Sequence, residues 1–433
     1  MEKYKDIEVE DLLKSELKLD KNKDKDSEED NEKKEKIKTN KKNPNQNSSN
    51  FNFEEIEKED AFNQVLYISS NHENNYISIG TLSGFKIFSL INKEIELVYQ
   101  FQYNPSEPVK IIEMLNTSHL ALLVGKNESN HLSPKKLNLF DLGEQKIIFS
   151  LKPYNKDIKL VRLNKKRIIV YADNAIFIYN LSNMKLLHSI ILEEDIINTE
   201  KTYYQGKICL SKNSEENNYL IYSISQSQGL IKVFDALYLT YVNFIHAHKN
   251  PIFKMCINSK GNLFASCSQN NGTIKIFNLP KGEKLFKFQR GYSYNIITGM
   301  NFNIIGNRKL VVSSGSGNIH IFDLDKQNKS SEKEKVINKE GYLNKINNIY
   351  QKVSKECKDY LNNKNLTTTV NVKDLLGENL LFFKEGKGNE NKNTTIIIAL
   401  TLEGFFFSIS IDMDNYIINN IFKKYIDSIK LKK

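Results

Sequence analysis

One short apolar motif recurs along the chain and constrains its fold more than any other feature. In most copies it starts at or near a glycine and ends in an aromatic residue, a polar residue and Leu. The copies lie at residues 84–90, 136–142, 175–181, 229–235, 272–279 and 317–324, with a degenerate copy at 404–409. The first six copies are roughly 40 to 55 residues apart, close to the period of a four-stranded propeller blade. Their apolar–polar alternation indicates half-buried strands.

Seven such units predict an all-β chain folded as a seven-bladed β-propeller. Seven blades of about 45 residues need roughly 315 residues, which fits the chain after residue 58 once one long insertion is set aside. The chain has no Trp, so the Trp-Asp ending of ordinary WD repeats cannot occur. Phenylalanine takes that place at Phe88, Phe140, Phe234, Phe277 and Phe322. We therefore expect divergent WD repeats over residues 59–433.

Two segments do not follow the repeat. Residues 1–58 are dominated by Lys, Glu, Asp, Asn and Ser. Such a segment carries too little apolar surface to offset the loss of chain entropy on folding, so we predict a disordered charged tail. Such a tail is either a solvated extension or a regulatory or targeting segment. Residues 325–393 form the long insertion, which we assign to a loop of blade six.

The insertion contains one segment with a helical pattern, near residues 342–361. Its apolar residues recur with a period of 3.6 and form one stripe, flanked by lysines. That stripe must be buried, either against the propeller or in a membrane interface. Periodicity leaves both options open. The apolar positions are Tyr342, Leu343, Ile346, Ile349, Tyr350, Val353, Cys357, Tyr360 and Leu361.

Charge and cysteine content narrow the functional classes. The net charge of +10 favours anionic partners, which include a membrane face, nucleic acid or an acidic protein. The four cysteines have no metal-binding spacing and indicate a reduced, intracellular protein. We expect no secretory signal, because residues 1–6 lack an apolar core, and no membrane span, because no run of 18 apolar residues occurs.

No pattern in the sequence indicates catalysis. There is no H-E-x-x-H arrangement and no G-x-S-x-G elbow. Gly315-Ser316-Gly317 lacks the Lys-Ser/Thr of a phosphate-binding loop and is typical of a strand turn. We predict a protein that is not an enzyme and that uses no cofactor and no metal.

Anion binding has more support, around the junction of the fifth and sixth copies. Residues 246–320 gather hydroxyl side chains, histidines and the tetrapeptide Phe288-Gln289-Arg290-Gly291. Hydroxyl and imidazole groups donate to phosphate oxygens, and an arginine does so with a bidentate fork. Each of these residues alone is also compatible with an ordinary turn or strand.

The tetrapeptide resembles the Phe/Leu-Arg-Arg-Gly signature of the PROPPINs, the β-propellers that bind phosphoinositides. Other segments resemble the same family in chain order. Residues 80–88 resemble its first blade, residues 112–125 its second and residues 247–275 its fifth. The position of the insertion also matches, and the resemblance covers residues 60–433. It implies seven blades with two phosphoinositide pockets on the rim of blades five and six.

The resemblance also implies which residues form the pockets. The first pocket would use His248, Ser266, Ser268, Thr273 and Lys275. Gln289 replaces the family's first arginine there, and losing a charged hydrogen bond to phosphate costs about 1.5–3 kcal/mol. We therefore expect a weakened first pocket. Thr273 also lies one residue further from Ser268 than in the family's usual pattern. The second pocket would use Arg290, with Gly291 beside it, together with Ser314, Asn318 and His320.

In the family the blade-six loop enters the bilayer, which favours the membrane option for the predicted helix. Its inserted residues would be Tyr342, Leu343, Ile346, Ile349, Tyr350 and Val353. Two pockets and one insertion act as linked weak contacts, so avidity would hold the protein on the membrane.

The resemblance therefore implies a monomeric effector of phosphatidylinositol 3-phosphate or the 3,5-bisphosphate. It would act in autophagy-related or endosomal and vacuolar trafficking and bring lipid-transfer or conjugation proteins to the membrane. We expect it in the cytoplasm and peripherally on vesicles, endosomes, the vacuole or pre-autophagosomal membranes. The alternative is a propeller scaffold for protein complexes without lipid binding. Nucleic acid is not an expected partner, because nothing beyond charge supports it.

Overall fold

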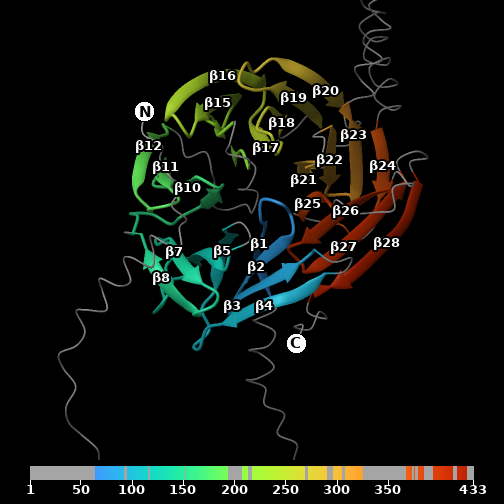
Figure 1. The fold of residues 1–433 in the computed structure, drawn as a ribbon. Helices are drawn as coiled ribbons and strands as arrows, with labels where there is room; N and C mark the ends of the chain where they lie inside the picture. Colours follow the sequence, from blue (N-terminus) through green and yellow to red (C-terminus); the bar gives the residue numbers. More distant parts are fainter. Residues whose placement is uncertain are drawn as a thin grey trace, which may run out of the picture.

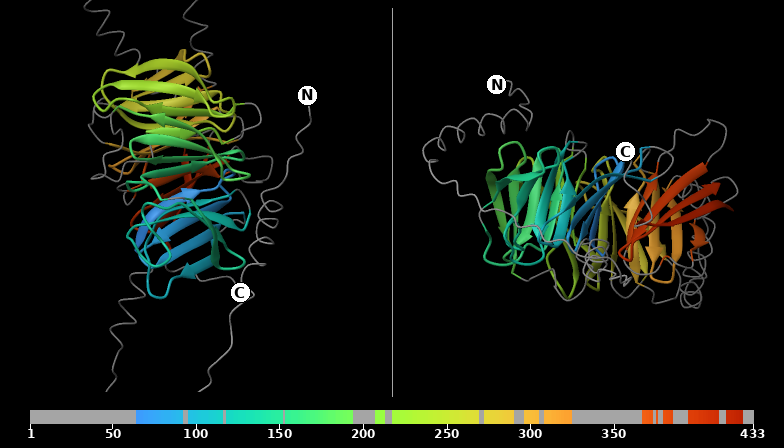
Figure 2. Two further views of the ribbon diagram at one scale, coloured as in Figure 1. Left: turned by 90° about the vertical axis from the view of Figure 1, so that its left-hand side faces the viewer. Right: turned by 90° about the horizontal axis from the view of Figure 1, so that it is seen from below.

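The protein is a ring of seven four-stranded sheets arranged around a central axis in a computed structural model (Figure 1). Viewed from the sides, the ring is a thick disc (Figure 2). The structure describes residues 64–91, 95–115, 118–151, 153–193, 207–212, 217–268, 272–289, 296–304, 308–324, 367–372, 375, 379–384, 394–412 and 417–426.

Blades 1 to 4 each consist of four consecutive strands in an antiparallel meander. Blade 1 contains β1 (Val65–Ser70), β2 (Tyr76–Thr81), β3 (Gly84–Ser89) and β4 (Glu96–Gln102). Blade 2 contains β5 (Val109–Met114), β6 (Leu120–Gly125), β7 (Asn138–Asp141) and β8 (Lys146–Ser150). Blade 3 contains β9 (Leu160–Leu163), β10 (Arg167–Ala172), β11 (Ala175–Asn180) and β12 (Leu186–Ile191). Blade 4 contains β13 (Ile208–Leu210), β14 (Tyr219–Ser223), β15 (Gly229–Asp235) and β16 (Thr240–His248).

Blades 5 to 7 repeat this arrangement. Blade 5 contains β17 (Ile252–Ile257), β18 (Leu263–Ser268), β19 (Thr273–Asn278) and β20 (Lys284–Gln289). Blade 6 contains β21 (Ile297–Phe302), β22 (Lys309–Ser314), β23 (Asn318–Asp323) and β24 (Thr367–Asn371). Blade 7 contains β25 (Asn379–Lys384), β26 (Thr394–Thr401), β27 (Phe405–Asp412) and β28 (Ile417–Tyr425). The first strand of each blade contacts the first strand of the next blade from β1 to β25, so these strands surround the centre of the ring. A cavity lined by all seven of these strands lies there, and we call it the central channel.

The hydrophobic core is divided into layers between neighbouring blades. The inner strands of each blade are buried on both faces, and their alternate side chains enter the layers on the two sides of the blade. The aromatic residue of the recurring motif packs toward the preceding blade. Phe322 of blade 6, for example, is fully buried beside Phe288 of blade 5, with ring centroids 4.4 Å apart. Phe277 and Phe234 occupy the equivalent layers of blades 5 and 4. The motif therefore marks an inter-blade contact, and phenylalanine fills that contact in place of tryptophan.

The ring closes through side-chain packing between blades 1 and 7. Ile68 and Ile79 of blade 1 share a buried cluster with Phe382 and Ile398 of blade 7. In the described part of the chain, each of these two blades is built from its own consecutive strands, so closure does not use a strand exchanged between the two ends.

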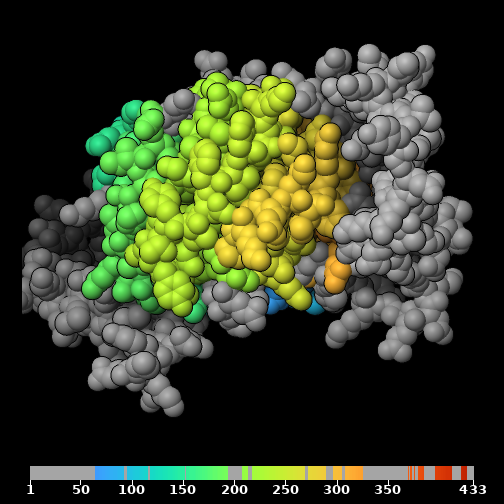
Figure 3. All heavy atoms as spheres, turned by 90° about the horizontal axis from the view of Figure 1, so that it is seen from above, coloured from blue at the N-terminus to red at the C-terminus, as the bar shows by residue number. Residues whose placement is uncertain are grey.

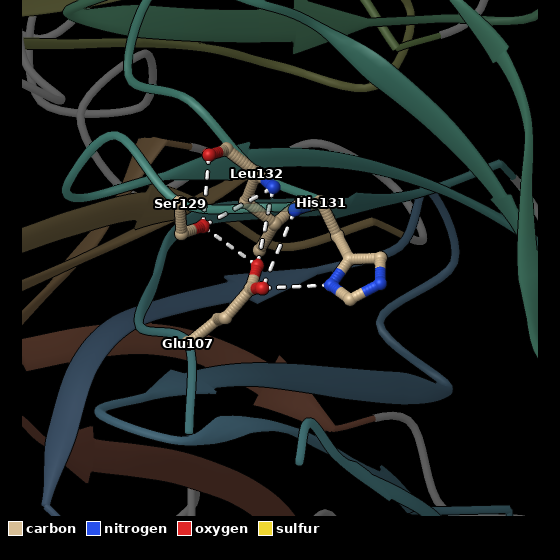
Figure 4. A network of polar contacts seen from close by, with 4 residues as sticks. All are labelled: Glu107, Ser129, His131 and Leu132. Carbon is tan, nitrogen blue, oxygen red and sulfur yellow. Dashed lines mark hydrogen bonds and ion pairs between the residues drawn. The ribbon is translucent and has the colours of Figure 1, made fainter. Parts of the chain in front are cut away.

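A buried carboxylate fixes a loop of blade 2 (Figure 4). Glu107, in the connection between β4 and β5, accepts hydrogen bonds from Ser129 Oγ at 2.7 Å and from the amide of Leu132 at 3.1 Å. Its other oxygen lies 2.7 Å from His131 Nδ1. Burial alone would raise the pKa of Glu107, but the bonds from Ser129 and His131 outweigh burial and lower the pKa. The ionised side chain therefore stabilises the loop between β6 and β7.

The predicted seven-bladed propeller is confirmed, and the recurring motif forms the third strand of every blade. Two strands, β24 and β25, lie inside residues 325–393, which the sequence suggested as one long loop. The sequence of β24 is Thr-Thr-Thr-Val-Asn. It has neither the glycine nor the aromatic ending of the recurring motif, so the motif does not predict this strand. The predicted tail, residues 1–58, and the predicted helix, residues 342–361, lie outside the described residues.

Candidate functional site

The two predicted pocket residue sets occupy equivalent positions in blades 5 and 6. In blade 5, Ser266 on β18 pairs with Lys275 on β19. In blade 6, His320 on β23 takes the place of Lys275 and pairs with β22. Ser268 and Ser314 each end the second strand of their blade, and Thr273 and Asn318 each begin the third. One hairpin geometry thus presents two sets of polar side chains on adjacent blades.

His248 joins blade 4 to the first set. It is the last residue of β16, is 4% exposed, and its Nε2 lies 2.9 Å from Ser266 Oγ. Its place depends on Gly229, which pairs with it on β15. A Cβ atom at Gly229 would lie 2.6 Å from the Cβ of His248, so any larger residue would push the imidazole away from Ser266. The strand register therefore holds His248 over blade 5.

Lys275 provides the positive charge of the first set. Its Nζ donates to the main-chain oxygen of Ala247 at 2.6 Å. Burial, and then the nearby Lys275, lower the pKa of His248 to about 4. Burial also lowers the pKa of Lys275, and Lys284 and Lys287 lower it further. At neutral pH the set therefore holds a neutral imidazole beside an ammonium group.

Ser268 adds an unsatisfied hydroxyl. The residue is 4% exposed, and its buried Oγ finds no hydrogen-bond partner among the described residues. Buried polar atoms are nearly always hydrogen-bonded, so this hydroxyl is available to a ligand oxygen. Thr273 is also buried and pairs in register with Gln289 on β20.

The second set is linked by hydrogen bonds within blade 6. Ser314 Oγ lies 3.0 Å from Ser316 Oγ, and Asn318 Nδ2 donates to that Ser316 oxygen at 3.1 Å. Asn371 on β24 donates to Asn318 Oδ1 at 2.6 Å. His320 on β23 is buried, and its Nδ1 lies 2.9 Å from Oγ1 of Thr369 on β24.

Sequence reasoning missed Thr369 and Asn371 because it placed them in the long loop. Their only sequence signal is a short β-branched run, Thr367–Val370, before β25. In the structure Thr369 pairs in register with His320, and Asn371 pairs with Asn318. From the outer strand β24, Thr369 and Asn371 orient the side chains of His320 and Asn318.

Gly317 makes the β22–β23 turn possible. Its φ is 76°, a conformation that side chains disfavour, and a Cβ there would lie 2.3 Å from the main-chain oxygen of Val372. This close approach brings the chain after β24 onto the turn that carries Ser314 and Asn318.

The structure therefore brings His248, Ser266 and Lys275 together in one set, and Ser314 with Asn318 in the other. Arg290, Gly291 and the side chain of Gln289 lie outside the described residues. So do the predicted membrane-inserting residues, Tyr342, Leu343, Ile346, Ile349, Tyr350 and Val353. Within the described ranges, no group of three or more His, Cys, Asp or Glu residues is placed to hold a metal ion.

Comparison with known proteins identifies similar chains. The family model described as PROPPIN matches residues 65–369. Autophagy-related protein 18 of Dictyostelium discoideum is 35% identical over 265 residues, which are 61% of this chain and 66% of that protein. The protein of the same name from Yarrowia lipolytica is 30% identical over 284 residues, 61% of this chain and 67% of that protein. WD repeat domain phosphoinositide-interacting protein 2 of Mus musculus is 31% identical over 271 residues, 62% of this chain and 57% of that protein.

These matches span about two thirds or less of the relatives' own length. Solved structures with a similar fold cover more of the chain. Hsv2 of Kluyveromyces lactis with its complete loop 6CD has a TM-score of 0.57 and 17% identity, and the match covers 84% of this chain and 99% of that one. A chain from a complex of KlAtg21 with the coiled-coil of AgAtg16 has a TM-score of 0.60 and 20% identity, with coverage of 83% and 99%. At these identities the structures show the shared fold.

Proposed function

The chain belongs to the PROPPIN family, and we propose that it is a non-enzymatic effector that binds phosphatidylinositol 3-phosphate or the 3,5-bisphosphate on the rim of blades 5 and 6. One observation carries this proposal. Blade 5 and the end of β16 carry an ammonium group (Lys275), a neutral imidazole (His248) and a buried hydroxyl with no hydrogen-bond partner among the described residues (Ser268). The chain leads from there through β20 to Arg290.

The chemistry of the first set suits a phosphate. An ammonium group has three N–H donors, and Lys275 uses one on the oxygen of Ala247. The others remain for a phosphate oxygen beside the Ser268 hydroxyl. Since a nearby anion favours the charged form of a base, phosphate would raise the pKa values of Lys275 and His248 and strengthen its own binding.

We assign Arg290 to the second pocket, together with Ser314, Asn318 and His320. In the first pocket Gln289 takes the place of an arginine, and Gln has no charge with which to form a bidentate bond to phosphate. We therefore propose two unequal pockets, of which the second contributes more to affinity.

Membrane residence would come from avidity between the pockets and the amphipathic segment of residues 342–361. The described residues contain no helix long and apolar enough to cross a membrane. We propose a monomer in solution that is recruited from the cytoplasm to vesicles, endosomes, the vacuole or pre-autophagosomal membranes. The names of the relatives, which refer to autophagy and to phosphoinositide interaction, support a role in autophagy-related trafficking.

A protein-binding role is the second candidate, and an exposed apolar surface favours it. The outer strands of blades 3 and 4 carry large exposed side chains, and the outer faces of blades 3, 4 and 5 lie side by side (Figure 3). Tyr241 and Phe244 on β16 are more than half exposed, and Ile191 on β12 is 82% exposed. We propose this face for a lipid-transfer or conjugation protein. A scaffold without lipid binding would use it alone.

Liposome flotation with phosphatidylinositol 3-phosphate tests the proposal on three proteins: wild type, Arg290→Ala and Gln289→Arg. We expect the wild type to float only with the phosphoinositide, Arg290→Ala to remain in the bottom fraction, and Gln289→Arg to bind more tightly. Equal flotation of Arg290→Ala and wild type would refute the assignment of Arg290. Absence of wild-type binding would favour the scaffold.

A further inference from the structure

The central channel is a cavity that is separate from the rim. Its volume is about 180 Å³, and its walls come from the first strands of all seven blades together with His72 and Lys212, which follow β1 and β13. None of the residues assigned to the two rim pockets lines it. A pocket for a drug-sized ligand is usually about 300–1,000 Å³, so this cavity suits a small ion or molecule.

The walls of the cavity carry an excess of positive charge. Among the described residues that line it, Arg162, Lys212 and Lys254 are cationic and Glu113 is the one carboxylate. Arg162 and Glu113 form an ion pair at 3.1 Å. The lining therefore has three positive charges and one negative charge, an excess of two at neutral pH. The lining cysteines Cys209 and Cys256 do not offset this excess, because burial raises the pKa of both thiols, that of Cys209 to about 12.

Lys212 reaches across the channel. It follows β13 of blade 4, and its Nζ donates to Asn74 Oδ1, 3.0 Å away in the β1–β2 turn of blade 1. Its second contact is the main-chain oxygen of Asn71 at 3.5 Å. Both acceptors are neutral, so they orient the ammonium group without cancelling its charge. Burial lowers the pKa of Lys212 to about 8, which keeps most of the group protonated at pH 7.

His72 adds a donor from the same turn. It lines the cavity, and its Nε2 is buried without a hydrogen-bond partner among the described residues. Burial, and then Lys212 and Lys165, lower the pKa of His72 to about 4. The ring is therefore neutral at pH 7, and Nε2 can carry the proton that a ligand oxygen would accept.

We infer that the central channel binds a small doubly charged oxyanion of the phosphate type, held by Lys212, His72 and the neighbouring cations. Such an anion would balance the two excess positive charges of the lining and accept a hydrogen bond from Nε2 of His72, which has no partner among the described residues. The same positive charge disfavours a metal cation, and a neutral ligand would leave that charge unbalanced. The phosphate group could come from inorganic phosphate or from an inositol headgroup, and the size of the cavity favours the smaller ion.

Equilibrium dialysis of the full chain with inorganic phosphate, at constant ionic strength, tests this inference. We expect saturable binding to wild type, and at least about tenfold weaker binding to Lys212→Met, because one charge-assisted hydrogen bond is lost. His72→Phe keeps a ring of similar shape without the donor and should also weaken binding. Lys185→Met is the matched control, since Lys185 is exposed on blade 3 and loses the same charge. Circular dichroism and thermal melting establish that each variant is folded.

A parallel titration with soluble inositol 1,3-bisphosphate separates the channel from the rim. We expect Lys275→Met to weaken the headgroup and leave inorganic phosphate unchanged, and Lys212→Met to do the reverse. The inference is overturned if wild type binds no inorganic phosphate, or if folded Lys212→Met and His72→Phe bind it as well as Lys185→Met does. It is also overturned if Lys275→Met, rather than Lys212→Met, abolishes phosphate binding. Each of these results leaves the rim proposal to its own test.

Discussion

Replacing Phe322 by alanine tests whether the recurring aromatic residue holds neighbouring blades together. Phe322 is 0% exposed and contacts the fully buried Phe288 across the layer between blades 5 and 6. Removing a buried Phe costs about 3–5 kcal/mol through lost transfer energy and the cavity that remains. The contact with Phe288 is worth about 0.5–1.5 kcal/mol beyond the buried area, and its loss is included in that cost. Because strands on both sides prevent collapse of the layer, we expect about 4–5 kcal/mol, the upper part of the first range.

Equilibrium unfolding in urea measures this loss as a lower transition midpoint at an unchanged slope. Phe422→Ala is the matched control, because Phe422 lies on the outer strand β28 and is 48% exposed. A partly exposed surface position should cost about 1 kcal/mol or less. A loss at Phe322 no larger than the loss at Phe422 would refute the inter-blade role of the motif.

Three further predictions concern polar side chains. Lys275→Met should weaken flotation on phosphatidylinositol 3-phosphate more than Lys287→Met does, since Lys287 is the exposed register partner on β20; equal effects would mean that only overall charge matters. The pKa of His248, about 4 against an ordinary 6.5, means that its neutral form stabilises the fold fully above pH 6.5. That stability is lost as the pH falls toward 4. Because the folded-state pKa is about 4, the NMR signals of the His248 ring should not titrate between pH 8 and 5.5. A titration midpoint near pH 6.5 would contradict the burial of the ring. Glu107→Gln removes the charge that binds the blade-2 loop, so amide hydrogen exchange of Leu132 should accelerate about fivefold or more for a loss near 1 kcal/mol, and unchanged exchange would refute the role of the carboxylate.

The propeller could be predicted because its signal is local and repeated. The aromatic residue of each third strand must fill an inter-blade layer, so residues such as Phe234, Phe277 and Phe322 recur at the blade period. β24 could not be predicted, because it is the outermost strand of its sheet and its run of threonines gives no aromatic signal. The partners that this strand supplies, Thr369 and Asn371, were missed for the same reason.

The candidate site was predictable only in part. Ser266 and Lys275 are close in sequence and meet by simple strand pairing. The contacts of the channel cations could not be predicted in this way, since Lys212 contacts Asn74 across 138 residues of chain. Only closure of the ring brings such residues together, and no local pattern encodes that contact.

The most direct test of the central claim is the lipid selectivity of the wild-type chain. Flotation would compare liposomes containing phosphatidylinositol 3-phosphate with liposomes containing the 4-phosphate at the same net charge. A specific rim site predicts recovery of the protein with the 3-phosphate and little with the 4-phosphate. Equal recovery on both would mean that the net positive charge of the chain drives binding, and would contradict phosphoinositide recognition by blades 5 and 6.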